Sequence, residues 1–129
     1  MIHVDFDPAQ LSGELKAWWD AWSSKAEEAT LKVIKAWEES KGKDMPPWNS
    51  DVWSELKTWL LKNVFHGKCA YCETGIDRFY GDAEHHRPKR GVKFRVGDNG
   101  EEKIGQAEDE EGNMMDHPGY FWLAYHWRN

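Results

Sequence analysis

The sequence has 129 residues but only two cysteines, at positions 69 and 72. A disulfide-rich secreted scaffold needs more pairs at wider spacing, so that class is excluded. No run approaches the about 18 apolar residues that a membrane-spanning helix requires. The first residues carry neither a basic patch nor an apolar stretch, so no signal peptide is predicted. These absences predict a cytoplasmic, reduced protein that does not enter a membrane.

What is present is an ordinary globular composition, with 40% hydrophobic and 31% charged residues. A chain of this length is typical of about one domain. The 23 acidic side chains outnumber the 17 basic ones, which gives a net charge of −6. A protein with this global charge is not steered to nucleic acid by its overall field.

The charge is nevertheless unevenly distributed along the chain. Residues 65–96 carry a net charge of +3, whereas residues 1–64 carry −3 and residues 97–129 carry −6. A local basic patch can bind phosphates in an acidic protein, because exposed charges act only over about 10 Å. On charge alone, a solvated basic surface is the favoured explanation of the block.

The sequence contains nine tryptophans, and three of them belong to a helical pattern in the first third of the chain. Apolar residues recur every three or four positions, at Leu11, Leu15, Trp18, Trp22, Ala26, Ala29, Val33 and Trp37. Asp7 is a plausible N-cap ahead of Pro8, and the helix should end near Lys41 and Gly42. We expect the tryptophans to form a core, because helical spacing alone explains them.

A second helix is predicted with Ser50 or Asp51 as its N-cap, and residues 1–64 therefore form a helical scaffold or interface region. Beyond residue 65 we expect short strands. Residues 92–96 alternate and lead into Asp98-Asn99-Gly100, which predicts a hairpin turn. Residues 101–117 are acidic and read as a mobile surface loop. The aromatic run 120–127 must be buried or bound to something.

The two cysteines form a C-x-x-C pair in a glycine-bounded turn. Two thiolates on one turn can bind a tetrahedral zinc ion, but they fill only two of its four positions. The pair is therefore half of a zinc knuckle, a redox motif or two isolated thiols. The redox interpretation needs a thioredoxin-like βαβ pattern, which the sequence does not show.

Residues 82–90 concentrate two acids, two histidines and three cations. Glu84 can bind a hard divalent metal ion through oxygen. A neutral histidine can deprotonate water, because its pKa lies near the working pH. The cations Arg87, Lys89 and Arg90 can bind phosphate oxygens. Close to a C-x-x-C pair, this combination favours a functional site over a histidine that merely packs in a core.

Three segments resemble the HNH endonucleases in order and spacing. They are GKCAYCE (Gly67–Glu73), AEHHRPK (Ala83–Lys89) and HPGYFWLAYHWRN (His117–Asn129). They are similar in particular to the HNH nuclease subunits of Septu-type anti-phage systems and of some retron effectors. The resemblance covers about residues 50–129 and, as three ordered motifs, is more specific than a lone C-x-x-C.

The resemblance implies an α+β protein in which Trp-rich helices precede a partial ββα-metal motif, with residues 65–129 as its N-terminal part. It implies that His85, three residues before Pro88, is the general base. Glu84 then contributes to binding one catalytic Mg or Mn ion. Asn129 matches the middle asparagine of the HNH name, which orients the histidine.

Cys69 and Cys72 match the first half of a knuckle that binds structural zinc. In the family the chain continues past the asparagine with a second C-x-x-C and a final metal ligand. This sequence stops at Asn129, so the remaining zinc ligands are expected beyond residue 129, in a longer parent protein.

The resemblance predicts an endonuclease that hydrolyses phosphodiester bonds of DNA or RNA in anti-phage defence. It implies an ATPase subunit of a defence complex as a partner and is compatible with an oligomer. The alternative is a zinc-stabilised, non-catalytic adaptor that docks a partner protein through the Trp-rich helices.

Overall fold

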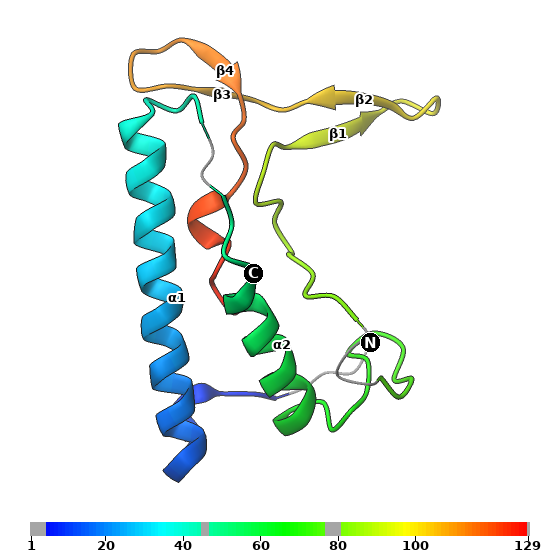
Figure 1. The fold of residues 1–129 in the computed structure, drawn as a ribbon. Coiled ribbons are helices and arrows are strands. Elements are labelled where there is room, and N and C mark those ends of the chain that lie inside the picture. The colour runs from blue at the N-terminus through cyan, green and yellow to red at the C-terminus, as the bar shows by residue number, and fades with distance from the viewer. Residues whose placement is uncertain (1–4, 45–46, 77–80, 129) are drawn as a thin grey trace. The chain divides into compact units, whose positions relative to one another are not determined.

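The computed structural model describes residues 5–44, 47–76 and 81–128 (Figure 1). Within these residues the helical elements are η1 (Pro8–Gln10), α1 (Gly13–Glu39), α2 (Ser50–Asn63) and η2 (Phe121–Leu123), of which η1 and η2 are 3-10 turns. The strands are β1 (Lys93–Val96), β2 (Glu101–Ile104), β3 (Gln106–Glu108) and β4 (Met114–Asp116). They form two antiparallel pairs, β1 with β2 and β3 with β4. The predicted α+β class is confirmed.

Packing divides the chain into two compact units that share α1. Unit 1 comprises residues 1–29 and 47–84, and unit 2 comprises residues 30–46 and 85–129. The units are therefore interleaved along the chain. The predicted division at residue 64 concerns function and stays a prediction.

Helix α1 is one uninterrupted rod of 27 residues (Figure 1). Its buried face consists of Trp19, Trp22, Ala26, Ala29 and Val33. The predicted stripe is confirmed from Trp22 to Val33, but it is wrong at its start. There Trp19 is buried, Trp18 is half-buried and Leu15 is exposed.

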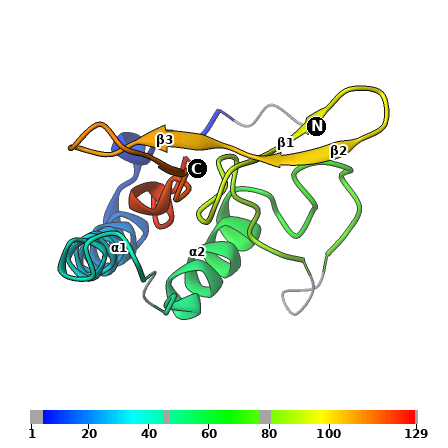
Figure 2. The ribbon, with the colours of Figure 1, turned by 90° about the horizontal axis from the view of Figure 1, so that it is seen from above.

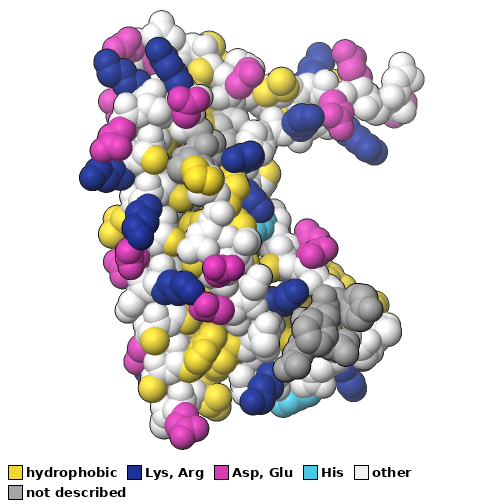
Figure 3. Space-filling model, viewed as in Figure 1, with side chains coloured by type: hydrophobic (Ala, Val, Ile, Leu, Met, Phe, Trp, Pro, Cys, Tyr) yellow, Lys and Arg dark blue, Asp and Glu magenta, His cyan; other side chains and the backbone are white. Residues whose placement is uncertain are grey.

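The outer surface of α1 is charged, with acidic and basic side chains interspersed (Figure 3). Lys16 and Asp20 pair at 2.6 Å between Nζ and Oδ2. Such exposed ion pairs add little stability, but their charges keep this face of the helix solvated. In the part of the chain that the structure describes, no helix combines the length and the apolar character that a membrane crossing needs.

The C-terminus of α1 lies where the sequence predicts it. Lys41 and Gly42 adopt φ values of 53° and 73°, which end the helix in the left-handed region. The Gly42 N–H donates to Trp37 O at 2.9 Å. A Cβ at Gly42 would lie 3.2 Å from the Trp37 ring, so a larger residue would disturb this close contact.

The core of unit 1 is aromatic and joins the first half of α1 to α2. Trp22 Nε1 donates to Val52 O at 2.9 Å, and Val52 is fully buried. Trp18 stacks on Trp59, with ring centroids 5.0 Å apart and planes 10° apart. The N-cap of α2 is Asn49, whose Oδ1 accepts from Asp51 N at 3.1 Å. The predicted cap at Ser50 or Asp51 is wrong by one or two residues.

The core of unit 2 places η2 beside the C-terminal half of α1, which is clear in the view from above (Figure 2). Phe121, Ala124 and Tyr125 are buried there, and the rings of Trp37 and Phe121 lie 5.0 Å apart. The expected burial of the aromatic run is thus confirmed for part of it.

The predicted hairpin turn at Asp98-Asn99-Gly100 is confirmed, because it joins β1 to β2. The expected mobile loop at residues 101–117 is wrong, because β2, β3 and β4 lie within it. The acidic run between β3 and β4 is ordered by Asp109, whose Oδ1 accepts from Asn113 N at 2.7 Å and from Glu111 N at 3.0 Å. Hydrogen bonds, chiefly from the Asn113 backbone, lower the pKa of Asp109. A local carboxylate-capped turn therefore outweighs the repulsion between the acids.

Candidate functional site

The two cysteines lie at the tip of a small hairpin in unit 1, here called the thiol hairpin (residues 68–75). A bridge between Lys68 and Gly75 closes it. Inside it, Cys69 N donates to Thr74 O at 2.9 Å, and Glu73 N donates to Cys69 O at 3.0 Å. Glu73 takes a φ of 62°, which lets the chain turn tightly. The predicted tight turn that holds a thiol pair is confirmed.

Both sulfur atoms have hydrogen-bond partners within this hairpin. Tyr71 N donates to Cys69 Sγ at 3.4 Å, and Cys72 Sγ lies 3.3 Å from Thr74 Oγ1. Hydrogen bonds from the Thr74 side chain, then from its backbone and from Cys69, lower the pKa of Cys72. Both thiols are free rather than joined in a disulfide. The turn thus favours the thiolate form of Cys72, which is the form that binds metal.

This geometry fits one half of a zinc site. Two sulfurs on one turn, each in contact with a polar donor, are suitable ligands for two tetrahedral positions. Among the described residues, no group of three or more His, Cys, Asp or Glu side chains is placed to hold a metal ion. A complete site therefore needs ligands in addition to these two cysteines.

The histidine segment (residues 85–92) belongs to unit 2 and contains no strand. The short strands that the sequence predicts beyond residue 65 therefore do not include this segment. Pro88 has no N–H for a ladder, and its carbonyl accepts from Tyr120 N at 2.8 Å. Gly91 N donates to Pro118 O at 3.0 Å. The segment thus pairs irregularly with residues 117–128, here called the aromatic segment.

Gly119 makes this pairing close. It adopts a φ of 90°, and a Cβ there would lie 2.7 Å from Arg90 N. Only glycine fits such an approach of two backbones. The motifs around His85 and around Tyr120 are distant in sequence, and the structure brings them together at this point.

His85 is the candidate site residue with the most defined geometry. It is half-buried, and its Nε2 lies 2.9 Å from Ala124 O. A carbonyl oxygen only accepts, so Nε2 must carry the hydrogen. In the neutral ring the lone pair then resides on Nδ1. His86, in contrast, is exposed.

Three cations follow His85 in the same segment. Arg87 and Arg90 are exposed and Lys89 is half-buried. The Arg87 guanidinium lies 5.9 Å from the centroid of the Tyr120 ring, a cation–π distance. The predicted phosphate-binding residues therefore lie on the same unit as His85.

The remaining predicted residues are less defined. Glu84 is exposed and is the last residue of unit 1, which also contains Cys69 and Cys72. Asn129 lies outside the residues that the structure describes. The roles of these residues stay predictions.

The chain is similar to the Septu protein PtuB of Bacillus mycoides (strain KBAB4), with 38% identity over 71 residues. These residues are 54% of this chain and 19% of that protein. The chain thus spans about a fifth of the length of the curated relative that it matches. No protein-family model and no solved structure matches. The similarity confirms a relation to a Septu protein over about half of the chain, and the HNH assignment stays a prediction.

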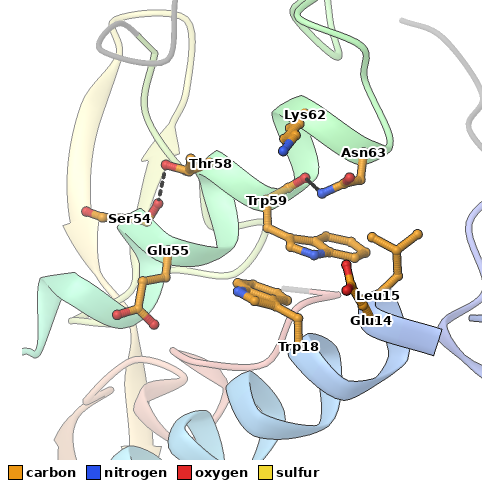
Figure 4. A pocket seen from close by; sticks show the side chains of 9 residues that line it. All are labelled: Glu14, Leu15, Trp18, Ser54, Glu55, Thr58, Trp59, Lys62 and Asn63. Carbon is orange, nitrogen blue, oxygen red and sulfur yellow. Dashed lines mark hydrogen bonds between the residues drawn. The ribbon is translucent and has the colours of Figure 1, made fainter. Parts of the chain in front are cut away.

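A groove of about 600 Å³ lies between the start of α1 and α2 in unit 1 (Figure 4). Leu15, Trp18 and Trp59 give it an apolar floor, and charged side chains including Glu14 and Glu55 lie at its rim. None of the predicted site residues lines it. The sequence analysis assigned these tryptophans to a core and did not anticipate an open groove beside them.

The sequence analysis also missed the carbonyl that holds His85. A backbone oxygen carries no side-chain signal, so the role of Ala124 is visible only in the structure. The one available signal was Pro118-Gly119 before the aromatic run, a dipeptide typical of a turn that permits close backbone approach.

Proposed function

We propose that the protein is a metal-dependent endonuclease of the HNH type that acts in a Septu-like anti-phage system. The observation that carries the proposal is the hydrogen bond between His85 Nε2 and Ala124 O, on a segment rich in cations. The similarity to a Septu protein supports the biological setting. We place the protein in the cytoplasm, where free thiols stay reduced.

In this mechanism His85 is the general base. With its hydrogen on Nε2, the ring accepts a proton from water at Nδ1 and directs the water's oxygen at phosphorus. The Ala124 carbonyl stabilises the imidazolium that results, because its oxygen still accepts from Nε2. Such a base contributes about 10²- to 10⁴-fold to a rate.

Arg87, Lys89 and Arg90 hold the phosphates that flank the scissile bond. Contacts of this kind position the nucleic acid without reading its sequence. Because they follow His85 directly in the chain, the bound backbone lies close to the base.

Glu84 would hold the catalytic Mg or Mn ion, which supplies neutralisation of the scissile phosphate and of the leaving oxygen. A single exposed carboxylate is compatible with this role, because Mg usually keeps several waters and uses one or two carboxylates together with substrate phosphates.

A cleavage assay tests the proposal. We expect the purified full-length protein to cut plasmid DNA or single-stranded RNA when Mg or Mn is added, and not when divalent ions are omitted. Returning Mg to the depleted reaction should restore cutting, whereas zinc alone should not. The proposal would be contradicted if neither nucleic acid is cut with any of these metal ions, or if cutting is equally fast without them.

We also propose that Cys69 and Cys72 bind structural zinc. In the full-length protein, the variant Cys69→Ser should lose bound zinc and become less stable to heat, because zinc binding and folding are coupled. Atomic absorption and a thermal melt measure the two effects. The matched control is Glu73→Ala, which lies in the same hairpin but supplies no thiolate. A zinc-free Cys69→Ser protein with an unchanged melt would count against the knuckle.

The groove of unit 1 favours a second candidate, the zinc-stabilised adaptor that docks a partner protein. An open surface with an apolar floor is typical of a docking site. The cleavage assay separates the two candidates, because an adaptor binds zinc but shows no Mg-dependent cutting.

A further inference from the structure

One aromatic side chain of η2 differs from its neighbours. Phe121 is 5% exposed, and Ala124 and Tyr125 are equally buried, yet Trp122 remains 42% exposed. The buried neighbours and the hydrogen bonds to the histidine segment hold η2 in place. The Trp122 ring therefore stays exposed, although the backbone that carries it is well anchored.

The rings of Tyr120, Phe121 and Trp122 form a small aromatic cluster, here called the platform. Trp122 lies 5.6 Å from the Tyr120 ring at 60° and 5.1 Å from Phe121 at 85°, which are edge-on contacts. Arg87 covers Tyr120. Trp122 is the exposed ring of this cluster, and an exposed aromatic ring near an arginine is a surface on which an unpaired base can stack.

The charged residues within the two segments that carry these rings are all basic. The histidine segment and the aromatic segment together contain four Lys or Arg residues and no Asp or Glu. This is unusual in a chain whose net charge is −6. Three hydrogen bonds join the two segments, at His85, Pro88 and Gly91. The surface is therefore complementary to a polyanion that also offers flat apolar rings.

The groove of unit 1 does not have this character. Its Trp18 and Trp59 stack on each other, and Glu14 and Glu55 would repel phosphate. A base-paired duplex is also a poor match for Trp122, because its base faces are already stacked inside the helix.

We propose that Trp122, with Tyr120 and Arg87, stacks an unpaired base of a single-stranded nucleic acid substrate. The inference rests on the proposed function and narrows its substrate class. Ala124 follows Trp122 by two residues and accepts from His85. A base stacked on Trp122 thus places its backbone on the unit that carries the general base.

The test measures binding in the full chain, in a His85→Ala background without added divalent ions, so that cutting does not interfere. The probes are fluorescent 12-residue oligo-dT, 12-residue oligo-U and a duplex of equal length. Trp122→Ala should raise the dissociation constant for single strands about tenfold or more. Trp122→Phe, which keeps a ring, should restore most of the affinity. Unequal losses for oligo-dT and oligo-U would identify which single strand the platform prefers.

The matched control is Phe94→Ala, since Phe94 is an aromatic residue of the same unit that is 53% exposed on β1. It should bind as the parent does. The proposal would be overturned if Trp122→Ala binds single strands with wild-type affinity. It would also be overturned if Trp122→Ala loses equal affinity for the duplex, or if Phe94→Ala loses as much affinity for single strands. If the parent cuts nucleic acid and Trp122→Ala binds normally, only this inference fails. If the parent neither binds nor cuts any nucleic acid, the proposed function fails with it.

Discussion

Cleavage by the His85→Ala variant should be at least about 10²-fold slower than cleavage by the wild-type protein. The alanine removes the ring whose Nε2 is bound to Ala124 O at 2.9 Å, so no group remains to accept the proton from water. Initial rates at saturating Mg measure the effect. Binding of nucleic acid should change little, because the cations of the segment stay in place.

His86→Ala is the matched control. It removes an adjacent but exposed imidazole, and it should cut near the parental rate. Zinc content and the thermal melt should be the same in both variants. The assignment of the base is refuted if His85→Ala cuts normally, and it moves by one residue if His86→Ala is the inactive variant.

The Trp22→Ala variant should lose about 3–5 kcal/mol of unfolding free energy, the usual cost of truncating a buried aromatic residue. Trp22 is buried against Val52 and donates its indole N–H to the Val52 carbonyl. Small domains are stable by only about 5–15 kcal/mol, so much of the margin would be lost. Urea denaturation followed by far-UV circular dichroism measures the change.

Two further variants show how much of this loss of stability comes from packing of the buried ring. Trp22→Phe keeps most of the packing and removes the hydrogen bond, which is worth about 1 kcal/mol, so it should be much milder. Leu31→Ala changes a residue of the same helix that is 60% exposed and should shift stability by no more than about 0.5 kcal/mol. Equal losses in Trp22→Ala and Leu31→Ala would contradict the aromatic core.

Helix periodicity was the most reliable information in the sequence. It predicts α1 and its end near Gly42, because a strong apolar period and a glycine terminus agree. The start of the stripe was less predictable. Trp18 and Trp19 are adjacent, and which of them is buried depends on where α2 lies, which periodicity does not contain.

The strands were harder to foresee. The hairpin at β1 and β2 follows from its turn residues, but β3 and β4 lie in a stretch that composition marks as a loop. A single carboxylate, that of Asp109, organises the turn between them. Net charge averages over such local hydrogen bonds and therefore does not reveal them.

The candidate site also has a part that could be predicted from the sequence and a part that could not. The cysteine pair and its turn could be predicted because all of their contacts are local. His85 could be singled out by its register before Pro88, but its partner is a backbone oxygen 39 positions away. Contacts of that range follow from the fold and not from spacing along the chain.

Because α1 belongs to both units, it limits how this chain can be truncated or combined with segments of related proteins. Its first half contributes to unit 1 and its second half to unit 2, yet it is one continuous helix. Neither unit can be expressed alone without ending a helix in its middle and exposing apolar surface. Chimeras with related proteins should therefore exchange both units together, and limited proteolysis should yield no stable fragment that corresponds to one unit.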